Sequence, residues 1–299
     1  MFFTRYNEIS ANLSKTFRSK KNLTEAASQF SELASSLDSK NSFEYHLIGL
    51  ARFGEMRCYE KLEDISKFIN TSILAARFFV KSAKFNYEIS PTIRDPWIDP
   101  LSNGIHCYKS AISVLKSTKK YNLAVLLLNE LGSVERHFYY FHNAGNEYEE
   151  AVRISTDRSL GVRIFSKSLF NCIECYASCE RFDLALILSV GVTAKIESDY
   201  IDSENKSPII QAKVKELNII NDLLFICDEK YQNAIKTIHL HKYEKNISDI
   251  LEKLIDLCQN KCIDQIQSMI DEFKTNTIFS ETFVIVLEKR CQAMRKTQS

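Results

Sequence analysis

Apolar residues recur at helical spacing along most of this chain, and the clearest instance lies between residues 121 and 155. Two amphipathic stretches follow each other there. Their inward faces carry Leu123, Leu127, Leu128, Leu131 and Gly132 in the first, and Phe141, Ala144, Tyr148, Ala151 and Val152 in the second. Small residues let two helices approach closely, while an aromatic ring fills the space between neighbouring pairs. The pattern predicts an antiparallel helix pair that buries its faces only by stacking on similar pairs.

The order of small and aromatic residues in this pair is typical of tetratricopeptide repeats. From Leu160 a similar pattern recurs, and Ala185 takes the position of Ala144 41 residues later. Because the tetratricopeptide period is ~34 residues, the repeat is degenerate and its helices are longer. We therefore predict an all-α fold, a tetratricopeptide-like α-solenoid of stacked antiparallel helix pairs.

Helical spacing also extends to both sides of this pair. It predicts helices over residues 2–18, 22–37, 43–59, 62 to the 80s and 101–115, and five more over 209–227, 230–243, 247–260, 262–273 and 277–294. Asn22, with Glu25 three residues later, has the spacing of a helix N-cap.

Two segments interrupt the helical pattern. Pro91, Pro96 and Pro100 bias the residues before them away from the α region, which predicts an ordered extended loop around Trp97. Residues 198–208 are polar and lack helical periodicity. We therefore predict an N-terminal array over 1–197, a polar loop over 198–208 and a C-terminal helical block, packed on the array, over 209–299.

Composition supports the helical prediction and narrows the class of protein. Seven Gly and four Pro in 299 residues leave few turns for a sheet protein. A formal net charge of +1 gives no global attraction to nucleic acid or anionic membrane. The longest apolar segments, such as 184–192, fall short of the ~20 residues of a spanning helix, and no signal peptide is visible. Nine cysteines without disulfide-type spacing fit a reducing compartment, the cytoplasm or nucleus.

Residues that could carry chemistry are few. Cys172, Cys175 and Cys179 share one helical face, but a metal centre needs a fourth ligand and a turn, so we interpret them as core residues. His239 and His241 lie two apart, which on a helix directs the rings differently. We find no nucleotide-binding or nucleophile motif and predict a protein that is not an enzyme and holds no cofactor or metal.

The N-terminal segment is the candidate contact region. It joins an apolar helical face to five basic residues against one glutamate. A basic amphipathic helix can dock on an acidic partner or an anionic membrane, or simply pack on the next helices with solvated lysines. Trp97 is either a partner anchor or a plug in its own loop. The candidate partner-binding residues are Arg5, Tyr6, Phe17, Arg18, Lys20, Lys21 and Trp97.

The N-terminal block resembles the family of the forty-kilodalton huntingtin-associated protein, the factor VIII intron 22 protein. The resemblance is densest in Phe2, Arg5, Tyr6, Ser10, Leu13, Lys15, Phe17, Lys20, Asn22, Glu25, Ala26, Gln29, Phe30, Leu33 and Leu37. It continues more weakly through Ala51, Arg57, Cys58, residues 75–78 and 95–101, and the two helix pairs. The C-terminal block matches in pattern only.

This resemblance implies a partner and a place in the cell. It implies a non-enzymatic scaffold that binds huntingtin as a 1:1 heterodimer, bridges its HEAT-repeat domains and stabilises one conformation. It also implies a link to the early-endosome Rab GTPase, to endosome motility and vesicle trafficking, and a location in the cytoplasm and on early endosomes, with a nuclear pool. The chain lacks the family's long Pro-rich insert, as a short invertebrate-type orthologue would. The alternative is a vesicle-fusion adaptor resembling the soluble NSF attachment proteins.

Overall fold

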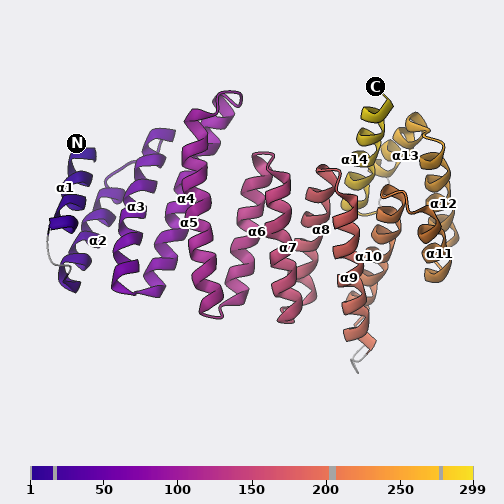
Figure 1. Cartoon of the computed structure of the whole chain (residues 1–299), viewed down its shortest axis with the longest axis horizontal. Coiled ribbons are helices and arrows are strands. Elements are labelled where there is room, and N and C mark those ends of the chain that lie inside the picture. The colour runs from indigo at the N-terminus through magenta and orange to yellow at the C-terminus, as the bar shows by residue number, and fades with distance from the viewer. Residues whose placement is uncertain (1, 16–18, 202–206, 276–278, 299) are drawn as a thin grey trace. The chain divides into compact units, whose positions relative to one another are not determined.

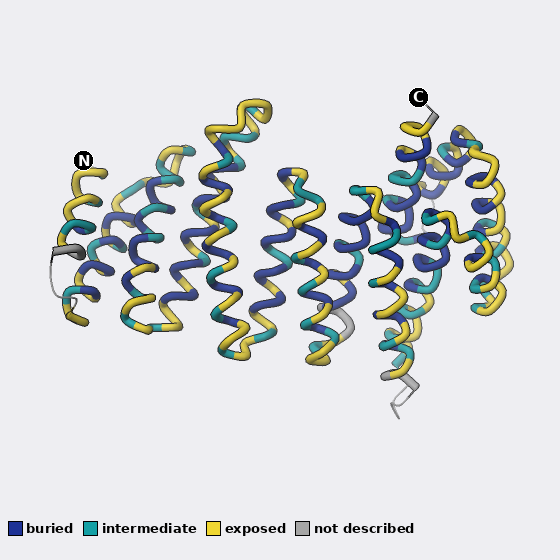
Figure 2. Tube along the Cα trace, viewed as in Figure 1, coloured by how far each residue is buried: buried dark blue, intermediate teal, exposed yellow. Residues whose placement is uncertain are grey.

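The computed structural model describes residues 2–15, 19–201, 207–275 and 279–298, and within these ranges it contains fourteen α-helices (Figure 1). The chain divides into two compact units, Met1–Leu127 and Leu128–Ser299. In each unit, successive helices run antiparallel and pack side by side, with buried residues on the sides that face neighbouring helices (Figure 2). Over the described ranges the predicted fold class is confirmed, since each unit is all-α and stacks antiparallel helix pairs in a tetratricopeptide-like manner.

The N-terminal unit follows the order of the sequence. Its helices are α1 (Phe2–Lys15), α2 (Lys20–Ser35), α3 (Ser42–Leu62), α4 (Ile65–Ile89), α5 (Asp95–Ser117) and the first part of α6 (Tyr121–His137). Each of the first four packs on the next, and α1 also contacts α3. A core around Ile9, Phe30 and Ile48 joins the first three helices because the apolar stripes predicted from sequence face one another there.

The C-terminal unit contains a second, larger core. Its helices after α6 are α7 (Phe141–Asp157), α8 (Val162–Ser178), α9 (Phe182–Ile201), α10 (Pro208–Cys227), α11 (Tyr231–His241), α12 (Lys245–Gln259), α13 (Ile263–Thr275) and α14 (Glu281–Gln298). The last helix returns to pack on α8 and α10. At this contact Thr282 Oγ1 donates to Glu174 Oε1 at 2.7 Å, a bond between residues 108 positions apart. Arg136 Nη1 pairs with the other carboxylate oxygen at 2.8 Å.

Small residues set the spacing of the predicted helix pair. A Cβ at Gly132 would lie 2.8 Å from the Tyr148 ring, and one at Gly145 would lie 2.8 Å from the Tyr176 ring. Both tyrosines are fully buried. The degenerate period is also present, because α8 begins 41 residues after α6. The prediction that Leu123 lies on the inward face is wrong. Its side chain is exposed, and Ala124 and Val125 are the buried residues of that turn.

Several helix–helix connections contain the same left-handed turn. Each has one non-glycine residue with a positive φ, and these residues include Lys119, Tyr139, Glu180, Glu229 and Lys261. The amide of the next residue bonds back to the last turn of the helix, as at Lys230, whose N–H donates to the carbonyl of Phe225 at 2.9 Å. This Schellman-type arrangement satisfies carbonyl groups that a helix end leaves without partners. It allows short connections without glycine.

The cap predicted at Asn22 is wrong. Helix α2 begins at Lys20, and the N-cap is Ser19, whose Oγ accepts from the Asn22 N–H at 3.3 Å. A serine is a favourable N-cap because its hydroxyl accepts from an amide of the first turn that has no helical partner, here the amide of Asn22.

The two predicted loops are shorter in the structure. Helix α5 begins at Asp95, with Pro96 in its first turn and Pro100 inside it. A proline is tolerated in the first turn because those amides have no helical partner. The loop predicted over 198–208 is helical through Ile201, and residues 202–206 lie outside the described ranges. A lack of apolar periodicity therefore did not mark the end of this helix. The five helices predicted between 209 and 294 are confirmed.

The close approach at Gly132 predicts a specific stability difference. Gly132→Ala should force the Tyr148 ring to shift, which costs about 1 to 3 kcal/mol for overpacking. Gly191 is the matched control because it lies in α9 with nothing within 4 Å of an added Cβ. Both variants gain helix propensity equally. The free energy of unfolding of Gly191→Ala should therefore rise by up to about 1 kcal/mol, and that of Gly132→Ala should be lower than that of Gly191→Ala. Urea unfolding of both variants measures the difference, and equal midpoints would contradict the packing argument.

Candidate partner-binding site

Two of the predicted contact residues lie on α1. Arg5 is exposed, and its Nη2 lies 3.5 Å from Glu32 Oε2 on α2. Tyr6 is half-buried, and its ring centroid is 5.3 Å from that of Phe30 in the core. Burial raises the pKa of the Tyr6 hydroxyl, with Arg57 opposing this shift. Arg5 is therefore available to a partner, whereas Tyr6 mainly anchors α1 to α2.

Lys20 and Lys21 lie at the opposite end of α2 from Glu32, the partner of Arg5, and form a separate basic group. Both are exposed in the first turn of α2. A cation at a helix N-terminus opposes the helix dipole, so these lysines do not stabilise their own helix. Their exposure leaves them free to meet an acidic partner. Phe17 and Arg18 fall outside the residues that the structure describes.

Trp97 is not a surface anchor. Its side chain is only 4% exposed, and its ring meets that of Tyr87 edge-on, with centroids 5.3 Å apart. The sequence left both a partner anchor and a plug in its own loop open, and the first turn of α5 directs the side chain inward. Trp97 therefore fills the core, as the alternative interpretation proposes.

The N-terminal unit exposes most of the large apolar side chains found outside the cores. They include Phe3, Phe43, Ile65, Leu74, Phe85, Ile89, Ile93, Leu123 and Leu126. A groove of about 660 Å³ also lies among α3, α4 and α5, with Phe53 and Met56 beside Arg57, Glu60 and Lys109. Exposed apolar groups with charged neighbours are typical of protein interaction surfaces.

Cys172 and Cys175 are core residues, as the helical spacing predicted, whereas Cys179 of the same predicted face is partly exposed. All nine are free, and Cys172 and Cys175 are completely buried. Burial raises the pKa of the Cys175 thiol to about 12, with Arg136 opposing this shift. The Cys172 thiol donates to the carbonyl of Gly145 at 3.3 Å. These thiols pack the C-terminal unit.

The two histidines of α11 point in different directions, as their spacing predicted. His239 is exposed, whereas His241 is half-buried beside the completely buried Asp222 of α10. The Tyr243 hydroxyl donates to Asp222 Oδ2 at 2.6 Å, and His241 Nδ1 lies 3.2 Å from the same oxygen. Thr237 Oγ1 bonds to the other oxygen. This cluster satisfies a buried carboxylate and fixes the end of α11 to α10.

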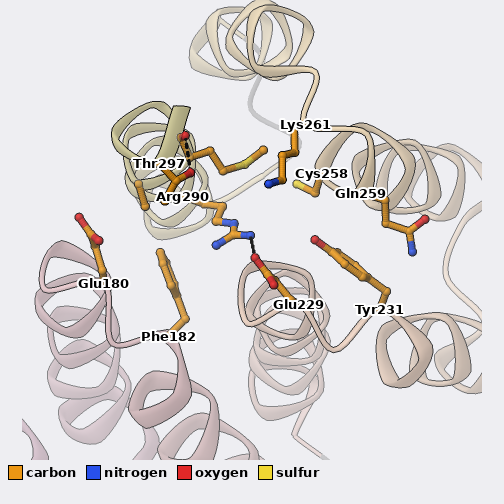
Figure 3. Close-up of a pocket in the computed structure, with 11 residues that line it drawn as sticks. Glu180, Phe182, Glu229, Tyr231, Cys258, Gln259, Lys261, Arg290 and Thr297 are labelled. Atoms are coloured by element: carbon orange, nitrogen blue, oxygen red, sulfur yellow. Dashed lines mark hydrogen bonds and ion pairs between the residues drawn. The ribbon is translucent and has the colours of Figure 1, made fainter. Parts of the chain in front are cut away.

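A cleft of about 420 Å³ lies in the C-terminal unit, where the turns after α8, α10 and α12 meet α14 (Figure 3). Its walls include Glu180, Phe182, Glu229, Tyr231, Cys258, Gln259, Lys261, Arg290, Ala293, Met294 and Thr297. Three of these residues, Glu180, Glu229 and Lys261, are the left-handed residues of those turns. The turns therefore position charged side chains around one hollow.

Arg290 is the central charge of the cleft. Its side chain is 13% exposed, and its Nη2 lies 2.6 Å from Glu229 Oε1, whereas the Glu229 side chain is 66% exposed. Burial alone would lower the pKa of the guanidinium, but the hydrogen bond to Glu229 raises it overall. Tyr231 and Lys261 point toward the same space (Figure 3). Burial raises the pKa of the Tyr231 hydroxyl and that of the Cys258 thiol, the latter to about 11.

Sequence reasoning did not find this cleft. Arg290 and Glu229 are 61 residues apart, and each lies in an ordinary amphipathic or turn context. The one available signal is the repeated short turn with a charged residue after each helix end. It gives no indication that α14 returns to face these turns.

Comparison with known proteins shows a likeness to solved structures. No family model matches the chain, and no curated protein matches it. Among solved structures, the crystal structure of the apo form of RapI is similar, with 14% sequence identity and a TM-score of 0.30. The alignment covers 99% of this chain and 98% of RapI. No helix within the described ranges is long and apolar enough to cross a membrane.

The thiols predict a labelling pattern that reports on the C-terminal core. Cys179 and Cys262 are partly exposed, and the other seven cysteines are buried. With a pKa of about 11, Cys258 stays protonated at pH 8, with a thiolate fraction on the order of one in a thousand. We expect alkylation of Cys262 well before Cys258 in the native protein, measured by mass spectrometry. Labelling of Cys258 should increase as the pH rises toward 11, and urea should expose all nine thiols equally.

Proposed function

We propose that this chain is a non-enzymatic interaction protein that binds huntingtin and stabilises one conformation of it by bridging its HEAT-repeat domains. The observation that carries the proposal is the dense residue match between 2 and 37 and the family of the huntingtin-associated protein. The structure gives these residues a physical role. Ala26, Phe30 and Leu33 form the core of the first helices, whereas Arg5 and Lys20 remain exposed.

The exposed apolar side chains of the N-terminal unit support a large protein partner. Phe43, Ile89 and Ile93 are each more than half exposed. An obligate interface buries well over ~2,000 Å² and is more apolar than the ordinary surface. A solenoid partner with complementary ridges could cover such scattered groups, because its surface extends over many helices.

The location in the cytoplasm and on early endosomes, a nuclear pool and the link to the early-endosome Rab GTPase belong to the same proposal. They rest on the family resemblance.

Co-expression with huntingtin from the same organism tests the proposed function. We expect a stable 1:1 complex when the tagged chain is purified and its mass is measured during size exclusion. The complex should survive moderate salt, because an apolar interface is screened less than a purely ionic one. A chain that elutes alone while both proteins remain folded would overturn the proposal.

The basic surface of α2 predicts a specific loss of affinity. Reversing both charges in Lys20→Glu/Lys21→Glu should weaken huntingtin binding about tenfold, mainly through slower association, because charges at an interface rim steer the encounter. The matched control is Lys119→Glu/Lys120→Glu, another exposed lysine pair at a helix start. Surface plasmon resonance measures both rates. Equal losses in the two variants would place the basic contact elsewhere.

A further inference from the structure

We propose that the cleft of the C-terminal unit binds an acidic side chain of a protein partner, with the ligand carboxylate taking the place of Glu229 on Arg290. The ligand is a short segment with Asp or Glu beside an aromatic or aliphatic residue. The proposed function supplies only the source of this segment, a protein partner. The site itself rests on the geometry of α14 and the three turns that face it (Figure 3).

The charges that point into the cleft leave room for one more carboxylate. Arg290 and Lys261 bring two cations, and the Tyr231 hydroxyl adds a donor. Glu180, also on the wall, is held by Lys296 at 2.5 Å. Within the described part of the chain no carboxylate lies within ion-pair distance of Lys261. Glu229 is therefore the one acid that faces these two cations.

Glu229 is suited to give way to a ligand. Its side chain is two-thirds exposed, whereas Arg290 is mostly buried, so the acid can move into water while the guanidinium stays in place. A guanidinium has a planar fork that binds a carboxylate through two parallel hydrogen bonds. Glu229 accepts from Nη2 alone, and Arg290 Nε is buried without a hydrogen-bond partner among the described residues. The pair is thus an incomplete version of the contact that a free carboxylate could make.

The rest of the wall selects an apolar neighbour for this carboxylate. Phe182, Ala293 and Met294 supply the apolar part of the wall, and the last two lie one turn along α14 from Arg290. Aromatic and methionine side chains adapt to varied apolar ligands. A volume of about 420 Å³ is within the range of ligand pockets and fits two amino-acid side chains, not a folded domain. The chemistry therefore favours a short linear segment.

A dipeptide probe tests this inference on the isolated full-length chain. The probe is N-acetyl-phenylalanyl-glutamate amide, and its control is the same peptide with glutamine. We expect the glutamate peptide to bind at least about tenfold tighter, because the charge-assisted bond is lost in the amide. Titration by ligand-observed NMR up to millimolar concentration gives both affinities. Equal binding of the two peptides, or no binding of either, overturns the proposal.

Variants of two exposed side chains make the test specific. Glu229→Gln removes the internal competitor and should raise affinity for the glutamate peptide several-fold. Lys261→Gln should lower it by a similar factor. Glu252→Gln and Lys253→Gln, both exposed on α12, are matched controls that should leave the affinity unchanged. Thermal unfolding confirms that each variant is folded. A Glu229→Gln variant that is folded and binds no tighter than wild type shows that Glu229 is not a place-holder, which overturns the proposal.

The outcome is separable from that of the proposed function, because huntingtin is absent from the titration. Peptide binding without a huntingtin complex would leave the cleft as the site of another acidic partner. A huntingtin complex without peptide binding would overturn only the inference about the cleft.

Discussion

The close approach of helices at glycine is the contact on which the stacked architecture depends. Gly132 and Gly145 each receive the ring of a tyrosine from a neighbouring helix at a distance that a Cβ would obstruct. Gly49 meets Phe79 and Gly54 meets Phe30 in the same way in the N-terminal unit. Each contact buries a large ring against the backbone at a glycine. The buried apolar area and the close packing of the ring stabilise the contact between neighbouring helices. Replacing the ring or the glycine therefore changes helix spacing as well as buried area.

Short left-handed turns follow from this packing. Long antiparallel helices can lie so close only if their connections are brief, and the residues at positive φ provide that brevity. A left-handed backbone conformation costs a non-glycine residue about 1 to 2 kcal/mol, and the packing of the neighbouring cores must offset this cost at each turn. The benefit is positional, since Glu229 and Lys261 project from rigid helix ends. A site placed on such turns is better ordered than one on long loops.

The positions of the helices along the chain could be predicted far better than the contacts between helices that are distant in sequence. The five helices after residue 208 follow from apolar spacing alone, because a 3.6-residue period survives even in divergent repeats. Leu123 was misplaced because the neighbour that a helix meets decides which face it buries. The loop around Trp97 was predicted too long because proline does not end a helix at its first turn. The Arg290–Glu229 pair depends on α14 folding back to α8 and α10, a contact without local signal.

The two candidate surfaces differ in the kind of partner that each can hold. Scattered exposed apolar groups such as Phe43 and Ile89 gain little from any small ligand, because each buries too little area alone. They contribute only when one large surface covers many of them at once. The cleft has the opposite character, since one desolvated guanidinium can dominate the binding of a small group. A partner that used both would gain buried area from the first surface and a fixed position from the second, and the exposed Glu229 would keep Arg290 paired until that partner bound.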